Sequence, residues 1–406
     1  MLEVADALAT VLKHAKPLKA EVAALTSAAL GQVLAADVVA DTDSPPFPKS
    51  LRDGYAVRSA DCAAPGAVLK VIETVYAGKM PTKPVGAGEA SRIFTGAPLP
   101  DGADAIVMQE DTQVAGPPDR VTHAVRITDA AVKPRQHVYA QGAETKAGAV
   151  VLARGTPINP AAFGVLASVG KTAVPAFPFP RVGIIATGDE LVEANMRPKP
   201  GQIRNSNGPM LTAQSVRGGG LPRYLGIARD DRAIMKSLVA EGIAVSDVVL
   251  IAGGVSVGDF DLVPDVLKEL GVTIHFRQIR VKPGKPLLFG TTEKGVLVFG
   301  LPGNPVSSFV GFELFVRPAI RILGGHAEAG PRTIRLPLAE GLAESNDRPT
   351  YRPAKLELGE GGWSVRPLPC SGAPDLVGLQ PADALLALPA GDARADRGTT
   401  VDVVLL

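Results

Sequence analysis

The chain has 406 residues, enough for two to four domains, and 46% of them are hydrophobic, as expected for ordinary globular cores. The formal net charge is only +1, which argues against a broad nucleic-acid-binding surface. Two cysteines are too few for a disulfide framework or a thiolate metal site, and the five histidines do not stand at a zinc-binding spacing.

Membrane insertion and export are not indicated by the sequence. No stretch of the sequence approaches the ~18 uninterrupted apolar residues that a membrane-spanning helix needs. The first residues include Glu3 and Asp6 and do not show the basic-then-apolar pattern of a signal peptide. We therefore expect a cytoplasmic protein that binds neither membranes nor nucleic acid.

The first part of the chain is expected to be a helical unit interrupted by a β-rich insertion. Within residues 1–40, apolar residues recur at helical spacing in two runs, one from Val4 and one from Val22, which predicts two amphipathic helices. Residues 41–145 contain short β-runs between turns, and helical spacing returns afterwards. We predict a helical linker domain, residues 1–40 with 146–178, and a β-rich inserted domain between these segments.

The second part of the chain changes pattern twice. From Arg181, apolar β-runs alternate with helical segments, which predicts a mostly parallel sheet covered by helices on both faces. We assign residues 179–327 to this central α/β domain. The pattern then returns to β-runs, and we expect residues 328–406 to form a small, β-barrel-like domain. The expected fold class is multidomain, α/β and β.

Acidic turns follow the first three strands of the predicted α/β domain. Glu190 belongs to the first turn, Asp230 to the second, and Asp259 and Asp261 to the third. Ligands bind outside the carboxyl ends of the strands in such sheets, so these turns are expected to converge on one site. Carboxylate oxygens suit Mg²⁺. The alternative, that the carboxylates cap helices and form turns, stands on an equal footing for Asp261, which is also a plausible helix N-cap.

A basic turn follows further along the chain. Lys282 and Lys285 flank the pair Pro283 and Gly284, which forms a tight turn, so both ammonium groups can point into one space. Such a pair suits phosphate or an oxyanion such as molybdate or sulfate. The alternative is a turn with two solvated lysines.

Two glycine-rich turns complete the candidate site. Gly253 and Gly254 allow a ligand to approach the backbone closely, although neither a Rossmann nor a P-loop pattern is present. Asn304 is expected to be the N-cap of a helix that begins at Pro305. The free N–H groups at such a helix start favour an anion. The sequence thus predicts a site for an anionic ligand and a divalent cation.

Six motifs stand in order along nearly the whole chain: SLRDGYAV (50–57), IFTGAPLP (93–100), IIATGDEL (184–191), GGVSVGDFD (253–261), KPGKP (282–286) and LPGNPVSS (301–308). Together they resemble the motifs of the molybdopterin molybdenumtransferases, the MoeA proteins, which are similar to the C-terminal part of gephyrin. The resemblance implies homodimers of four-domain subunits, with the helical linker domain contributing to dimerisation. It also implies a transferase that joins molybdate to the dithiolene of adenylylated molybdopterin, releases AMP and requires Mg²⁺.

The resemblance implies catalytic roles for Glu190, Asp259, Lys282, Lys285 and Asp53. Glu190 and Asp259 would be the metal-binding residues, and the two lysines would hold molybdate or phosphate. Asp53 would reach the site from the second subunit, together with the threonine of the TGAPLP turn. Substrate binding is implied for residues in the turns and the last domain: Thr95, Thr187, Gly253, Gly254, Ser256, Asp230, Pro302, Asn304, Ser307, Arg352 and Ser371.

One segment departs from the family pattern. The family usually shows basic residues before a Gly-Glu-Asp turn, but residues 139–144 read YAQGAE, with Glu144 in place of the Asp. This departure argues mildly for a second interpretation, a non-catalytic molybdopterin-binding carrier or a gephyrin-like scaffold, whereas the retained lysines and carboxylates favour the enzyme. The implied partners are adenylylated molybdopterin, molybdate, a second copy of the chain, the molybdopterin adenylyltransferase and molybdoenzyme apoproteins.

Overall fold

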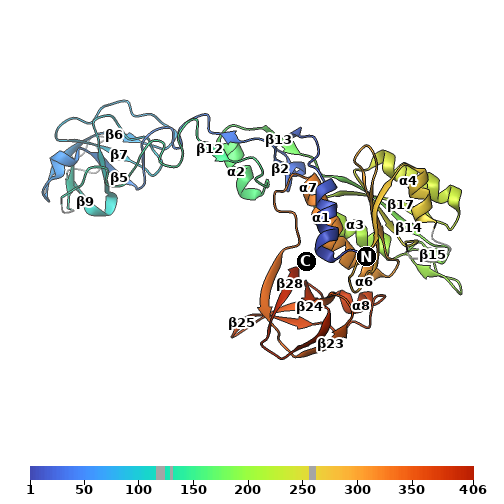
Figure 1. The fold of residues 1–406 in the computed structure, drawn as a ribbon. Coiled ribbons are helices and arrows are strands. Elements are labelled where there is room, and N and C mark those ends of the chain that lie inside the picture. The colour runs from blue at the N-terminus through green and yellow to red at the C-terminus, as the bar shows by residue number, and fades with distance from the viewer. Residues whose placement is uncertain (116–123, 129–130, 256–261) are drawn as a thin grey trace. The chain divides into compact units, whose positions relative to one another are not determined.

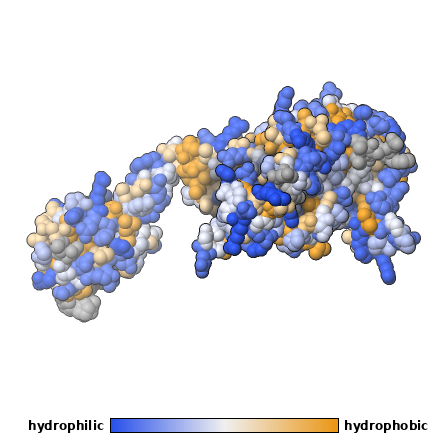
Figure 2. Space-filling view, turned by 60° about the horizontal axis from the view of Figure 1, so that its bottom comes forward, coloured by the Kyte–Doolittle hydropathy of each residue, from blue (hydrophilic) through white to orange (hydrophobic). Residues whose placement is uncertain are grey.

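The computed structural model describes residues 1–115, 124–128, 131–255 and 262–406, and it divides into two compact units (Figure 1). The first unit contains residues 1–36, 154–160 and 173–406, and the second contains residues 37–153 and 161–172. Within the described residues, no helix has both the length and the apolar character that crossing a membrane requires. On the face shown in Figure 2, hydrophobic residues are scattered among hydrophilic ones.

A six-stranded sheet forms the centre of the first unit. Its first four strands pair in parallel, and the last two are antiparallel. This confirms the prediction of a mostly parallel sheet. In spatial order the strands are β17 (Leu221–Ala228), β14 (Arg181–Thr187), β18 (Val248–Ala252), β21 (Leu297–Leu301), β20 (Pro286–Thr291) and β19 (Thr273–Gln278).

Helices cover both faces of this sheet. Successive residues of β18 point to opposite faces, so Val248 and Leu250 join one hydrophobic core while Val249 and Ile251 join the other. The first core includes residues of α1, α3, α6 and α7, and the second includes residues of α4 and α5. The bounds of these helices are α1 (Val4–His14), α3 (Asn207–Arg217), α4 (Arg232–Val245), α5 (Val263–Glu269), α6 (Pro305–Gly311) and α7 (Arg317–Leu323).

The prediction of two helices in residues 1–40 is half right. Helix α1 is present, but the second helix is replaced by strand β1 (Glu21–Ala24), a single 3₁₀ turn and strand β2 (Val33–Leu34). Both strands pair with β13 (Ala173–Phe177). Val22 is 77% exposed, so the apolar spacing in this segment does not mark a buried helical face. Pairing with a strand about 150 residues away overrides the local pattern, as tertiary context often does.

The second unit is the β-rich region that the sequence predicts. Its six-stranded sheet is antiparallel except for the pair β6·β7, which is parallel. Helix α2 (Pro160–Ser168) confirms the helical spacing expected after the β-rich region. In spatial order the strands of the sheet are β8 (Ala105–Met108), β5 (Gly54–Val57), β7 (Glu89–Ile93), β6 (Val68–Val75), β10 (Ala124–Ile127) and β9 (Thr112–Ala115). Shorter strands of the unit are β3 (Val38–Val39), β4 (Lys49–Ser50), β11 (Val138–Tyr139) and β12 (Val150–Leu152).

The end of the chain forms the predicted small β domain. A five-stranded antiparallel sheet has the spatial order β22-β28-β26-β24-β25, and β23 pairs with β27. The bounds are β22 (Thr333–Pro337), β23 (Leu342–Asn346), β24 (Thr350–Gly359), β25 (Gly362–Pro367), α8 (Leu376–Leu379), β26 (Ala384–Leu388), β27 (Gly391–Ala395) and β28 (Thr400–Leu405). The domain boundaries given above stay predictions.

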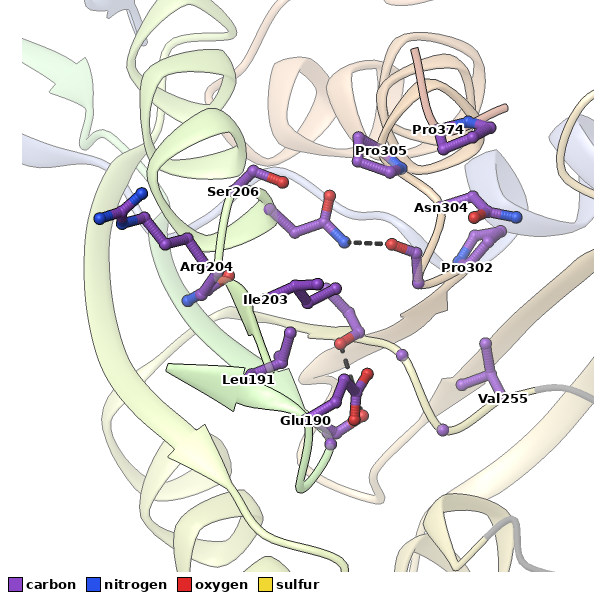
Figure 3. A pocket seen from close by; sticks show the side chains of 18 of the residues that line it. Glu190, Leu191, Ile203, Arg204, Ser206, Val255, Pro302, Asn304, Pro305 and Pro374 are labelled. Carbon is purple, nitrogen blue, oxygen red and sulfur yellow. Dashed lines mark hydrogen bonds between the residues drawn. The ribbon is translucent and has the colours of Figure 1, made fainter. Parts of the chain in front are cut away.

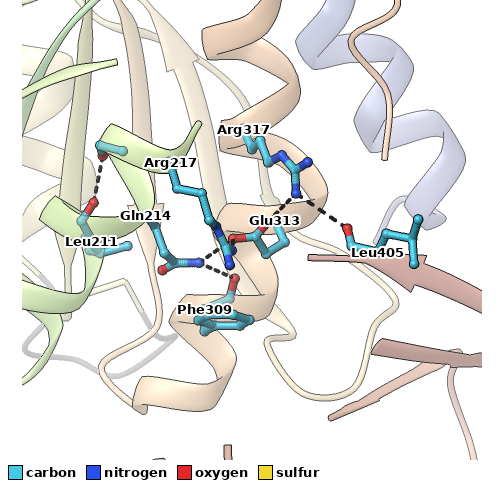
Figure 4. A network of polar contacts seen from close by, with 8 residues as sticks. Leu211, Gln214, Arg217, Phe309, Glu313, Arg317 and Leu405 are labelled. Carbon is cyan, nitrogen blue, oxygen red and sulfur yellow. Dashed lines mark hydrogen bonds and ion pairs between the residues drawn. The ribbon is translucent and has the colours of Figure 1, made fainter. Parts of the chain in front are cut away.

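A buried carboxylate ties several of these elements together (Figure 4). Glu313 lies in a π-helical turn (Phe312–Val316) between α6 and α7, and it is 2% exposed. Its carboxylate accepts hydrogen bonds from Gln214 Nε2 at 2.7 Å, from Arg317 Nη1 at 2.9 Å and from Arg217 Nη2. The Arg317 guanidinium also donates to the carbonyl oxygen of Leu405 at 3.4 Å. One side chain thus joins α3 and α7 directly, and the last strand through Arg317.

We expect Glu313→Ala to lower the free energy of unfolding by about 3 kcal/mol, because removing one partner of a buried ion pair leaves the other charges unmatched. Differential scanning calorimetry should show a fall of about 2–4 °C in the unfolding midpoint for each kcal/mol lost. The matched control is Glu241→Ala, since Glu241 pairs with Arg223 on the surface. It should change stability by less than about 1 kcal/mol. Equal effects of the two substitutions would contradict the role assigned to Glu313.

Candidate functional site

The carboxyl ends of β17, β14 and β18 lie side by side, as the acidic turns require. Arg229 Nη1 donates to the carbonyl oxygens of Asp189 at 2.9 Å and Leu191 at 3.0 Å. The backbone N–H of Asp230 donates to Asp189 Oδ1 at 3.1 Å. Asp189 therefore holds the first two acidic turns together. Glu190 and Asp230 instead line a cavity.

This cavity has a volume of about 740 Å³ and opens at the ends of the parallel strands. Figure 3 shows Glu190 and Leu191 on one side and Asn304, Pro305 and Pro374 on the opposite side. Among the described residues, seven that the sequence predicts for the site line it: Thr187, Glu190, Asp230, Gly253, Gly254, Pro302 and Asn304.

The two glycine-rich turns meet at the floor of the cavity. Gly253 has a φ of +102°, and its N–H donates to the carbonyl oxygen of Leu301 at 2.9 Å. A Cβ at this position would lie 2.6 Å from Thr187 Oγ1 and 2.8 Å from the Thr187 carbonyl oxygen. A Cβ on Gly303 would come 3.8 Å from the Cα of Gly253. The close approach of three chain segments requires glycine at position 253.

The start of α3 forms a wall of the cavity that the sequence analysis missed. Asn205 Oδ1 accepts from the N–H of Gly208 at 3.0 Å, which fixes the first turn of the helix. Asn205 Nδ2 donates to the Tyr224 hydroxyl at 2.8 Å, and burial and then Glu193 raise the pKa of that hydroxyl. Asn207 Nδ2 donates to the carbonyl oxygen of Gly303 at 2.8 Å. The polar run 205–207 before a predicted helix was the signal available in the sequence. The lining residues of this wall are Ile203, Arg204, Asn205, Ser206 and Asn207.

The basic turn borders the cavity without lining it through its lysines. Pro286 lines the cavity, and a Cβ on Gly284 would lie 3.4 Å from the carbonyl oxygen of Ser307. Lys282 Nζ donates to Asn346 Oδ1, and the Lys282 backbone pairs with the strand that contains Thr350. Lys285 is exposed. The turn therefore lies between the helix start at α6 and the terminal β domain.

The helix start itself agrees with the sequence. Helix α6 begins at Pro305 with Asn304 at the N-cap position, although the Asn304 side chain makes no capping hydrogen bond. Ser307 is 3% exposed and does not line the cavity.

Residues of the terminal β domain reach the cavity through one loop. Pro374 and Leu376 line it, and the Ser371 N–H donates to Asp375 Oδ2 at 2.8 Å. This N–H and that of Gly378 lower the pKa of the Asp375 carboxyl. Ser371 comes shortly before Pro374 in the chain but does not itself line the cavity. Arg352 Nη2 donates to the carbonyl oxygen of Leu368 at 3.2 Å, which places it under the same loop.

Two further predicted site residues, Asp53 and Thr95, belong to the second unit. In the second unit, Asp53 Oδ1 accepts from the Thr95 hydroxyl and from the Thr95 N–H, each at 2.7 Å. These bonds lower the pKa of the Asp53 carboxyl and keep it ionised. Ser256, Asp259 and Asp261 lie outside the described residues. Helix α5 begins at Val263, with Leu262 at its N-cap position.

The segment that departs from the family pattern is held by local hydrogen bonds. The Ser44 hydroxyl donates to Glu144 Oε2 at 2.6 Å, and the Glu144 N–H donates to the Ser44 carbonyl oxygen at 2.8 Å. Burial and the charge of Glu144 raise the pKa of Tyr139. Gln141 Nε2 donates to Asp43 at 3.1 Å. Glu144 thus takes part in closing this turn.

The carboxylates that line the cavity fit a magnesium ion better than a transition metal. No group of three or more His, Cys, Asp and Glu side chains gathers within the described residues. Glu190 and Asp230 both line the cavity. Mg²⁺ is commonly held by one or two carboxylates together with water and substrate phosphates. This donor set meets that requirement.

The fold and the cavity together define an open, mostly parallel α/β domain that binds ligands at the carboxyl ends of its strands. Three family models match the chain in succession. These are the MoeA N-terminal region, domains I and II, over residues 2–170, a probable molybdopterin binding domain over residues 183–322, and the MoeA C-terminal region, domain IV, over residues 335–406.

Similar proteins cover the whole chain. A molybdopterin molybdenumtransferase of Staphylococcus aureus is 36% identical over 100% of this chain and 95% of its own length. One of Staphylococcus epidermidis is 36% identical over 93% of this chain and 89% of its own length. The solved structure of a molybdopterin biosynthesis moeA protein from Pyrococcus horikoshii is similar with a TM-score of 0.84 and 30% identity, covering 100% of both chains. The chain therefore belongs to the MoeA family.

We expect Gly253→Ala to lower the free energy of unfolding by more than the ~1–2 kcal/mol that a positive φ costs a non-glycine residue, because the new Cβ also meets Thr187. The matched control is Gly219→Ala, because Gly219 has a φ of +87° and no atom of the described residues lies within 4 Å of the new Cβ. Urea unfolding of both variants measures the difference. If the two variants lost the same stability, the close packing at position 253 would not be a constraint.

Proposed function

We propose that this chain joins molybdate to adenylylated molybdopterin and releases AMP and the molybdenum cofactor. The cavity at the ends of β14, β17 and β18 carries this proposal, because its lining combines two carboxylates with two glycine-rich turns. The proposal is also supported by relatives that are named molybdopterin molybdenumtransferase and match at least 93% of this chain.

The proposed mechanism depends on positioning and electrostatics rather than on a covalent intermediate. Glu190 and Asp230 would hold Mg²⁺ in this mechanism, with Asp259 as a further expected ligand. The ion would neutralise the pyrophosphate of the substrate. The N–H groups at the start of α6 favour the same negative charge. Lys282 and Lys285 would hold molybdate beside the dithiolene, whose sulfurs would replace molybdate oxygens that leave as water. Attack of water on the pyrophosphate anhydride would break it and release AMP.

The remaining substrate contacts are assigned by motif. Ser307, Arg352 and Ser371 lie around the basic turn and the loop of the terminal domain, where they would bind the molybdate or phosphate end of the substrate. Asp53 and Thr95 would complete the site from the second subunit of a homodimer. The reaction would take place in the cytoplasm, between the molybdopterin adenylyltransferase that supplies the substrate and the molybdoenzyme apoproteins that receive the product.

A second candidate function is that of a non-catalytic molybdopterin carrier or a gephyrin-like scaffold. The observation in its favour is the segment 139–144. Glu144 accepts a hydrogen bond from the Ser44 hydroxyl there, and the basic residues usual in the family are missing. Incubation of the wild-type protein with adenylylated molybdopterin, molybdate and Mg²⁺ decides between the two. Binding without AMP release would favour the carrier.

We expect Glu190→Gln to reduce AMP release about a hundredfold, in line with the loss of one electrostatic contact to the reacting groups. AMP is measured by chromatography during a time course with saturating molybdate. The control is Glu241→Gln, a substitution of a surface carboxylate on α4 that pairs with Arg223. It should leave the rate unchanged. An unchanged rate in Glu190→Gln would remove this carboxylate from the proposed mechanism.

A mixture of Asp53→Ala and Glu190→Ala proteins should recover activity if each site combines residues of two subunits. Random exchange of subunits in a two-fold dimer makes half of the dimers hybrid, and each hybrid has one intact site of two. We therefore expect about a quarter of the wild-type rate, with each variant alone inactive. Mass spectrometry of the mixture confirms the exchange. No recovery after confirmed exchange would show that the site does not join these residues across subunits.

A further inference from the structure

Two aromatic rings stack on the surface of the second unit, one residue beyond the ends of neighbouring strands. Tyr76 follows β6 and Phe94 follows β7, and the N–H of Phe94 donates to the carbonyl oxygen of Val75 at 3.2 Å. The two ring centroids are 5.0 Å apart, and the ring planes differ by 9°. The Arg92 guanidinium lies 5.4 Å from the centroid of the Phe94 ring. The strand pairing thus holds both rings in parallel orientation.

The ring of Tyr76 remains open to solvent in this arrangement. Tyr76 is 55% exposed, whereas Phe94 is half-buried. Single exposed hydrophobic residues are common on protein surfaces and need no explanation. Tyr76 differs because a second ring fixes its orientation, so a flat ligand could stack on it with little loss of side-chain freedom.

A carboxylate is linked to the stacked pair through the residue that follows Phe94. Asp53 is bonded through Oδ1 to Thr95, the residue after Phe94. Within the described residues both of these hydrogen bonds fall on Oδ1, which leaves Oδ2 able to accept from a ligand. Gln109 links the groups further, because its N–H donates to the Asp53 carbonyl oxygen at 3.0 Å and its Oε1 accepts from Arg92 at 3.4 Å. The rings and the carboxylate therefore form one connected patch.

We propose that the pterin ring of the substrate stacks on Tyr76 and that its N–H edge donates to Asp53. This inference rests on the proposed function, which brings Asp53 to the substrate. An ionised carboxylate only accepts hydrogen bonds, and the pterin edge presents an amino group beside a ring N–H. The adenine edge presents an amino group beside an acceptor nitrogen, which an ionised carboxylate does not match. The pterin is therefore the ring that this patch selects.

The test compares dissociation constants for two ligands, molybdopterin without molybdate and AMP, in wild-type protein and two variants. Tyr76→Ala should weaken molybdopterin binding about tenfold, as expected for the loss of one stacking contact. Tyr76→Phe keeps the ring and should change the constant less than twofold. AMP binding should be unaffected in both variants. Because Tyr76 is exposed, both variants should keep the unfolding midpoint of the wild type.

Four results would overturn the inference. If Tyr76→Ala bound molybdopterin as tightly as wild type while the wild type released AMP normally, the stacking would be wrong and the proposed function would stand. If AMP binding fell instead of molybdopterin binding, adenine would be the stacked ring. Equal weakening by Tyr76→Ala and Tyr76→Phe would point to the hydroxyl rather than the ring. If the wild type neither bound molybdopterin nor released AMP, the proposed function and this inference would fail together.

Discussion

The parallel pairing of β17, β14, β18 and β21 is the constraint on which the rest of the structure depends. Parallel strands point their carboxyl ends to one edge, so turns that are far apart in the sequence meet there. Such pairing requires burial on both faces, and the alternating residues of β18 enter two separate cores. The carboxylates of the turns can therefore be presented to a ligand without entering a core.

The two neighbouring carboxylates of the first acidic turn have different roles. Asp189 accepts the N–H of Asp230 and so fixes the second turn against the first, whereas Glu190 lines the cavity. A turn with a single carboxylate could perform only one of these two roles. The buried Glu313 supports the cavity indirectly. Its carboxylate accepts a hydrogen bond from Gln214 of α3, and residues at the start of α3 line the cavity.

Much of this arrangement could be predicted because it depends on local pattern. The β-runs and helical segments after Arg181 follow the spacing of their apolar residues. The basic turn and the two glycine-rich turns follow from their glycine, proline and charged residues. The prediction of a second helix from Val22 was wrong. Pairing with the distant strand β13 determines the structure of this segment, and the spacing of its own apolar residues does not reveal that pairing. The wall formed by residues 205–207 was missed for a related reason. Its asparagines act through Tyr224 and Gly303, which only the folded chain brings near.

The contact between Lys282 and Asn346 has a consequence for the flexibility of the basic turn. A lysine side chain normally samples many rotamers, and holding it for a ligand costs conformational entropy. Here the backbone of the turn pairs with β24 and the ammonium group donates to the end of β23, so much of that freedom is already lost before any ligand arrives. The terminal β domain therefore restrains the side chain of Lys282, which belongs to the α/β domain. Changes in β23 far from the acidic turns would alter the direction in which this positive charge points.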